Sequence, residues 1–123
     1  MKRTLVIERD SQAPGKARDA VAGLVPHVDE RLVPNAKLLL SELITNSVKY
    51  GSGPITLRFD VEAPHRLRCE VADDGGGFTP VARSGSRRDV GGWGLYLVEE
   101  LAASWGVRDG STHVWFRLAL EDQ

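Results

Sequence analysis

The sequence has only one cysteine, Cys69, among its 123 residues. A single cysteine excludes an internal disulfide and any metal site built from several thiolates. It lies in an alternating apolar run, which predicts a buried, unreactive thiol. Near the N-terminus only three consecutive residues, 5–7, are apolar before charges resume. This run is far too short for a signal peptide or a membrane span, so we expect a cytoplasmic protein without a membrane partner.

An excess of one charge is also missing, because 16 basic and 17 acidic residues give a net charge of −1. A chain without a large field offers no argument for nucleic acid or an acidic membrane as its main partner. Hydrophobic residues make up 41% of the chain, which is enough for a core without disulfide staples. The length fits one domain, which we expect to span residues 1–123.

Hydrophobic periodicity predicts three helices and about five strands. Short alternating or β-branched runs predict strands at 4–9, 55–61, 67–72, 107–109 and 113–120. Helical spacing predicts helices at 11–25, 34–50 and 93–105. This order predicts a two-layer α/β sandwich, with a mixed, mostly antiparallel sheet of about five strands and three helices on one face. Trp105 and Trp115 are expected to face the core, and the polar stretch 79–90 is expected to form a mobile loop.

The second predicted helix carries an acid and an amide, Glu42 and Asn46, in an otherwise apolar stretch. At about 100° per residue, these two side chains lie roughly 40° apart on the helical wheel. A glutamate is costly to bury and an asparagine is a mediocre helix former, so the pair favours a ligand, a metal ion or a water. Taken alone, a surface glutamate beside a tolerated asparagine would explain the same pattern. The neighbouring face gathers Leu40, Leu43, Ser47 and Tyr50.

Two glycine-rich stretches follow this helix. Asp73 ends a predicted strand, and the glycines 75–77 come just after it. Glycines allow a ligand to approach the backbone, and the carboxylate can accept a hydrogen bond from an exocyclic amine such as that of adenine. An Asp-Gly turn would explain these residues equally well. The second stretch, 91–95, opens a helix, whose N–H groups can bind phosphate oxygens. Neither stretch is a Walker A loop, and the second lacks the Rossmann fingerprint.

Three parts of the sequence resemble, in their order and spacing, the three motifs of the GHKL (Bergerat-fold) ATP-binding domains. They are Glu42 with Asn46, the stretch 73–77 and the stretch 92–94. The GHKL group contains gyrase-type ATPases, histidine kinases and anti-sigma serine kinases. The resemblance covers nearly the whole chain. Three segments are most similar to the bacterial anti-sigma factor serine kinases of the RsbW and SpoIIAB type, namely 42–51, 91–107 and 113–118.

The resemblance implies a Bergerat fold that uses ATP and Mg²⁺. It implies that Asn46 is the Mg²⁺ ligand, because an amide oxygen suits a hard cation. It also implies that Asp73 accepts from the adenine amino group and that Glu42 accepts the proton of an incoming hydroxyl. Further nucleotide contacts are implied for Gly75, Gly77, Gly92, Trp93, Gly94 and Leu95. Weaker candidates for neutralising phosphate charge are Arg83, Arg87 and Arg88.

The implied function is that of an anti-sigma factor that regulates transcription as an ATP-dependent protein serine kinase. Its substrate would be an anti-anti-sigma (antagonist) protein, a sigma factor would be a further partner, and the kinase would pair as a homodimer. The alternatives are a non-catalytic ATP-binding or protein-binding module, a simple ATPase and a histidine-kinase fragment.

The last predicted strand departs from the family's pattern at one position. The family carries a threonine directly before the Val-Trp pair, whereas here His113 stands at that position and Thr112 comes one residue earlier. A one-residue step turns a side chain to the other face of a strand, so Thr112 takes the threonine's role only if a bulge intervenes.

Overall fold

The computed structural model describes residues 1–75, 92–107 and 113–120. In these residues five strands form one sheet in the order β1-β2-β3-β5-β4. The strands are β1 (Lys2–Ile7), β2 (Ile55–Ala63), β3 (Arg66–Ala72), β4 (Ser104–Val107) and β5 (Val114–Ala119). The helices are α1 (Ala13–Ala22), α2 (Val33–Tyr50) and α3 (Gly92–Leu101), and a short 3-10 helix, η1, covers Glu30–Leu32. None of these helices combines the length and apolar character that a membrane crossing requires.

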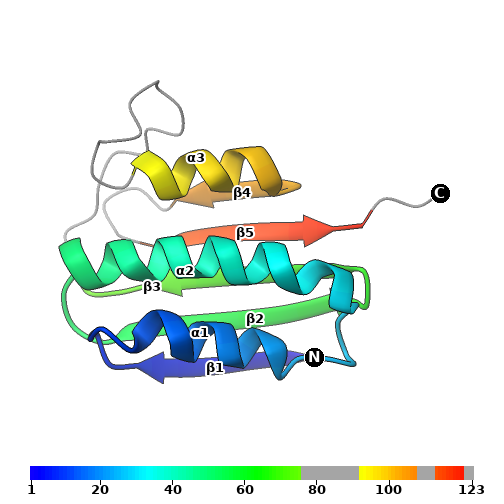
Figure 1. Ribbon diagram of the computed structural model, residues 1–123, viewed down its shortest axis with the longest axis horizontal. Helices are drawn as coiled ribbons and strands as arrows, with labels where there is room; N and C mark the ends of the chain where they lie inside the picture. Colours follow the sequence, from blue (N-terminus) through cyan, green and yellow to red (C-terminus); the bar gives the residue numbers. More distant parts are fainter. Residues whose placement is uncertain (76–91, 108–112, 121–123) are drawn as a thin grey trace.

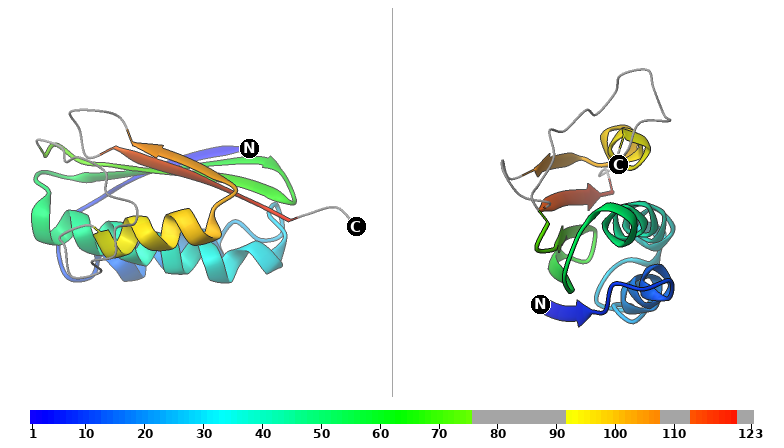
Figure 2. Two further views of the ribbon diagram at one scale, coloured as in Figure 1. Left: turned by 90° about the horizontal axis from the view of Figure 1, so that it is seen from above. Right: turned by 90° about the vertical axis from the view of Figure 1, so that its left-hand side faces the viewer.

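The helices form one layer and the sheet forms the other. Neighbouring strands pair antiparallel at every described step of the sheet. Both views of Figure 2 show α1, α2 and α3 on the same face of the sheet. The predicted two-layer α/β sandwich, the fold expected of a Bergerat domain, is therefore confirmed.

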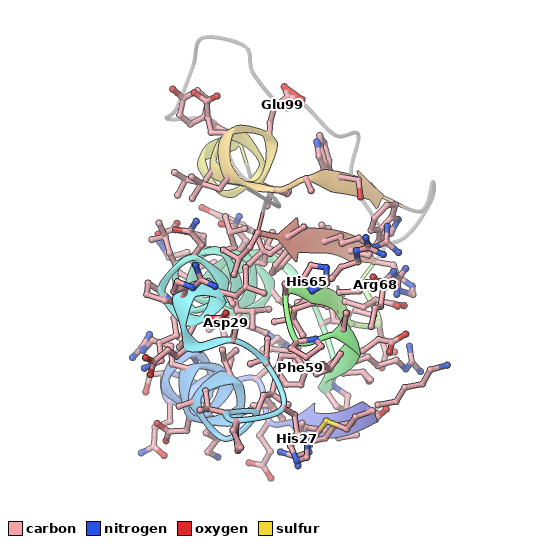
Figure 3. All side chains as sticks on the ribbon, turned by 90° about the vertical axis from the view of Figure 1, so that its right-hand side faces the viewer. His27, Asp29, Phe59, His65, Arg68 and Glu99 are labelled. Carbon is pink, nitrogen blue, oxygen red and sulfur yellow. The ribbon has the colours of Figure 1, made fainter. Side chains whose placement is uncertain are left out.

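The core lies between the two layers because burial alternates along the strands. Phe59 of β2 pairs with Cys69 of β3, which pairs with Phe116 of β5, and all three are at most 2% exposed. Figure 3 shows Phe59 between the sheet and the helices and Arg68 on the sheet's other face. Burying one such aromatic side chain stabilises the fold by about 1.5–3 kcal/mol. Burial also raises the pKa of the Cys69 thiol well above its ordinary value, which makes the thiol unreactive, as predicted.

Helix α2 is the central helix, with α1 on one side and α3 on the other (Figure 1). Its buried residues are Ala36, Leu39, Leu40, Leu43, Ile44 and Ser47. Tyr50, which shares that face on the helical wheel, is 57% exposed. The wheel gives a residue's direction only, and in the last turn of the helix more than half of this side chain stays exposed.

Two expectations for the tryptophans and the third helix are wrong. Helix α3 ends at Leu101, and Trp105 lies in β4, where it pairs with Phe116 of β5. Pairing at the sheet edge therefore overrode the helical spacing that predicted a helix up to Trp105. Trp105 packs against the core, as expected, but Trp115 lies on the helix-free face of the sheet, between the buried Val114 and Phe116. The predicted loop 79–90 lies outside the described residues.

Candidate functional site

The elements that carry the three predicted motifs meet at one end of the sandwich. Helices α2 and α3 lie side by side and run in opposite directions, so the last turns of α2 lie beside the start of α3 (Figure 1). Strand β3 finishes at the same end, and Asp73 follows its last residue. Asn46, Asp73 and Gly92 therefore lie toward this end, with Glu42 one helical turn further from it, as the resemblance implies.

Asp73 is tied directly to α2. The Ser47 hydroxyl donates a hydrogen bond to Asp73 Oδ2. The backbone N–H of Gly75 donates to Asp73 Oδ1 at 2.7 Å. In β3, Cys69 and Val71 face the helices, and the two-residue period directs Asp73 to the same side. This role of Ser47 was not predicted, although its place on the apolar face of the helix was a signal, since a buried hydroxyl requires a partner.

The loop after α2 makes room for the two carboxylates at the end of β3. A Cβ atom on Gly51 would lie 1.9 Å from Asp73 Oδ2, and one on Gly53 would lie 2.3 Å from Asp74 Oδ2. Gly53 also has a φ of +70°, which L-residues with a side chain rarely adopt. The Asp74 N–H donates to the Ser52 carbonyl at 2.9 Å. These glycines therefore allow a close approach between the end of α2 and the end of β3.

Arg9 connects the end of β1 to the last turn of α2 and was also missed. Its Nε donates to the Gly53 carbonyl at 3.1 Å, and its Nη1 donates to the Val48 carbonyl at 3.4 Å. The carbonyls at a helix C-terminus lack partners within the helix, and a cation there also interacts favourably with the helix dipole. Arg9 thus stabilises the turn that leads from the helix of Asn46 into the glycine loop.

Glu42 and Asn46 lie one helical turn apart on α2, as their spacing predicts, and both are half-buried. Within residues 1–75, 92–107 and 113–120, neither side chain has a hydrogen-bond or ion-pair partner. Partly buried polar groups normally find a partner in the protein, in water or in a ligand. An acid and an amide in this state are suited to contact a ligand.

The residues at this end fit a nucleotide with one magnesium ion. The Asp73 carboxylate is held in a defined place, and each of its oxygens can accept more than one hydrogen bond. The start of α3 supplies backbone N–H groups, which suit phosphate. No cluster of three or more His, Cys, Asp or Glu side chains that could hold a metal occurs in the described part of the chain. Mg²⁺ commonly binds to one or two protein oxygens together with phosphates and waters, and the amide oxygen of Asn46 would suit it as such a ligand.

The structure does not describe every predicted site residue. Gly75 is the last described residue of the first glycine stretch, and residues 92–95 form the start of α3 with only their backbone described. The side chains of Trp93 and Leu95 are therefore not placed. Outside the described residues lie Gly77, Arg83, Arg87, Arg88 and Thr112.

His113 does not take the place of the family's threonine. Its Nε2 contacts Glu70 Oε2 on the helix-free face of the sheet, whereas Asp73 faces α2. Glu70 also accepts a hydrogen bond from Arg68 at 2.7 Å. Burial raises the pKa of the Glu70 carboxyl, but the hydrogen bonds from Arg68 and His113 outweigh burial and hold this pKa below its usual value. These contacts make His113 part of a charged cluster on the outer face of the sheet.

The chain matches the family model of the histidine kinase-like ATPase domain over residues 8–118. No curated protein matches the chain. The matched range contains α2, the end of β3 and the start of α3, so it includes the whole region described above.

Proposed function

We propose that this chain, which belongs to the histidine kinase-like ATPase family, is an ATP-dependent protein serine kinase of the anti-sigma factor type. The family supports ATP binding and, in general terms, phosphoryl transfer from ATP. The proposal of catalysis depends on Glu42. Its carboxylate is half-buried, lies one helical turn from Asn46 and has no partner among the described residues. Serine specificity is supported by the resemblance of the segments 42–51 and 91–107 to the RsbW and SpoIIAB type of kinase.

Each polar group at this end has a distinct role in the proposal. Asp73 accepts a hydrogen bond from the adenine amino group, while Gly75 keeps its carboxylate in place. The backbone N–H groups at the start of α3 bind phosphate oxygens. Asn46 would hold Mg²⁺, which would offset the negative charge of the phosphates.

Glu42 acts as the general base for transfer to a serine hydroxyl. The serine oxygen forms a bond to the terminal phosphorus of ATP as the bond from that phosphorus to the ADP oxygen breaks, and ADP leaves. The hydroxyl proton passes to the Glu42 carboxylate. A base must have an acceptor oxygen within reach of the hydroxyl, and no described cation pairs with Glu42 to compete for it.

The proposal includes three protein partners. The substrate serine belongs to an anti-anti-sigma (antagonist) protein, a sigma factor is bound as the regulated target, and a second copy of the chain forms a homodimer. These partners are supported only by the resemblance to anti-sigma kinases. We also propose that residues 1–123 act as one domain in the cytoplasm.

Calorimetric titration of ATP with and without Mg²⁺ tests the nucleotide site. We expect wild-type binding to depend on the metal and Asn46→Ala to lose that dependence. Asn35→Ala is the matched control, because Asn35 is exposed in the first turn of the same helix. Absence of ATP binding at any Mg²⁺ concentration would favour a protein-binding module without kinase activity.

Replacement of Glu42 by alanine tests the catalytic base. We expect nearly unchanged ATP affinity, because Glu42 contacts the hydroxyl and not the nucleotide, and a rate of phosphoryl transfer at least about 100-fold lower. The measurement is transfer of labelled terminal phosphate to purified candidate antagonist proteins. Glu30→Ala, at an exposed position in η1, is the control. Transfer at the wild-type rate in Glu42→Ala would remove the assignment of the base.

A further inference from the structure

Among the residues that the structure describes, Ser47 carries the only buried polar side chain. It directly follows Asn46, and its hydroxyl donates to Asp73 Oδ2, 26 residues further along the chain. A buried hydroxyl without a hydrogen bond costs free energy, so the fold favours keeping this contact. Ser47 therefore links the helix of Asn46 to the carboxylate at the end of β3.

The Asp73 carboxylate is restricted from three sides. The Gly75 N–H donates to Oδ1 at 2.7 Å, and the Ser47 hydroxyl donates to Oδ2. Oδ2 also occupies the space that a side chain at position 51 would fill, since a Cβ on Gly51 would lie 1.9 Å from it. These neighbours come from α2, from the loop after it and from the turn after β3. Together they limit rotation of the carboxylate about its Cβ–Cγ bond.

Adenine and guanine differ in what they offer to such a carboxylate. Adenine presents one exocyclic amine next to a ring nitrogen that carries no hydrogen. Guanine presents a ring N–H and an exocyclic amine side by side, and this pair can bind both oxygens of a carboxylate at once. A carboxylate has about four acceptor sites, of which Ser47 and Gly75 each use one on Asp73. A two-point contact needs both oxygens aimed at the guanine edge at once, whereas the adenine amine needs only one of them. A carboxylate whose direction is fixed from α2 and from the turn after β3 therefore suits a single donor better.

We infer that Ser47 is a positioning residue that makes the nucleotide site selective for adenine over guanine. The inference rests on the proposed function, because it requires Asp73 to contact the base. Ser47 acts through Asp73, by holding Oδ2 in one direction and by occupying one of its acceptor sites. Without the hydroxyl, the carboxylate can turn, its alignment with the adenine amine weakens and a two-point contact to guanine becomes accessible.

The test is calorimetric titration of ATP and of GTP, each with Mg²⁺, into wild type and Ser47→Ala. We expect the variant to bind ATP about tenfold more weakly, which corresponds to about 1.4 kcal/mol. We also expect a smaller ratio of ATP affinity to GTP affinity. Ser47→Thr, which restores a hydroxyl, should recover the ratio. Ser41→Ala is the matched control, because the Ser41 hydroxyl lies on the same helix but accepts from Arg18 Nη1 at 3.0 Å.

An unchanged ratio in folded Ser47→Ala would overturn the inference and leave the proposed nucleotide site intact, provided that the wild type binds ATP. A wild type that binds neither nucleotide would overturn both. If thermal melting shows that Ser47→Ala does not fold, Ser47→Cys replaces it, since the thiol is similar in size but a weak donor. The cysteine variant should also show a reduced ratio, and a wild-type ratio would count against the inference.

Discussion

Replacement of Gly51 by alanine should displace the Asp73 carboxylate while leaving the backbone conformation accessible. Gly51 has φ −90° and ψ −167°, an extended conformation that alanine can adopt. The added Cβ would lie 1.9 Å from Asp73 Oδ2 and 2.8 Å from the Ser47 carbonyl oxygen. Real Cβ contacts essentially never fall below 3.0 Å, so Oδ2 must move by about 1.1 Å, the difference between 3.0 Å and 1.9 Å.

A shift of this size strongly weakens the hydrogen bond between Ser47 and Asp73, because such bonds weaken steeply beyond their narrow range of lengths and angles. A hydrogen bond to a charged group contributes roughly 1.5–3 kcal/mol, so the free energy of unfolding should fall by about that amount. If Asp73 binds adenine, ATP affinity should fall by roughly ten- to a hundredfold, since each factor of ten is about 1.4 kcal/mol.

Urea denaturation and calorimetric titration of ATP with Mg²⁺ measure the two effects. Gly23→Ala is the matched control, because its Cβ would approach no described atom closer than 3.5 Å and its φ is −71°. The control should keep wild-type affinity and gain about 0.4–1 kcal/mol of stability at most. If Gly51→Ala matched the wild type in both stability and affinity, the close packing of Asp73 against this loop would be refuted.

The remaining predictions concern acid stability and the loop after α2. The folded-state pKa of Glu70 lies below the ordinary 4.5, so its ionised form stabilises the fold above about pH 4.5, and this stabilisation is lost as the pH falls through the lower folded-state pKa. In urea denaturation, the stability difference between wild type and Glu70→Gln should therefore be larger near about pH 6 than near about pH 3; an equal difference at both would argue against the contacts of the Glu70 carboxylate with Arg68 and His113. Gly53→Ala should lower the free energy of unfolding by roughly 1–2 kcal/mol or more, because φ is +70° and the Cβ would meet Asp74 Oδ2 at 2.3 Å. Thermal melting beside Gly23→Ala checks this, and an unchanged melting temperature would contradict the left-handed conformation.

Strand and helix periods could be read from the sequence because each is a local property. The alternation in 55–61 and 67–72 predicted β2 and β3, and the spacing of Glu42 and Asn46 placed both on one side of α2. The predicted position of Asp73 at the end of a strand also holds, because Asp73 directly follows β3. These expectations are confirmed because local backbone geometry fixes which side chains share a face.

The tryptophans show where local patterns were insufficient or were misread. Trp115 and Arg117 are two residues apart on β5, so their side chains share one face of the strand. The sequence therefore already indicated that Trp115 points outward, although its apolar ring favoured a core position. On the outer face its ring lies 4.9 Å from the Arg68 guanidinium carbon and 5.7 Å from that of Arg117. Cation–π contacts of this kind stabilise the half-buried Trp115 side chain on the outer face. Trp105 fitted a helical spacing equally well, and only its pairing with Phe116 decided that it belongs to a strand.

The sequence by itself determined the two-layer sandwich and the elements that carry Glu42, Asn46 and Asp73. Only the tertiary structure decided that the Ser47 hydroxyl binds Asp73 and that Gly51 leaves the space its carboxylate fills. Such contacts join segments more than twenty residues apart, and they depend on how closely helix and sheet pack. A hydrophobic period records which face of an element is buried, but it carries no information about which atom on another element that face will meet.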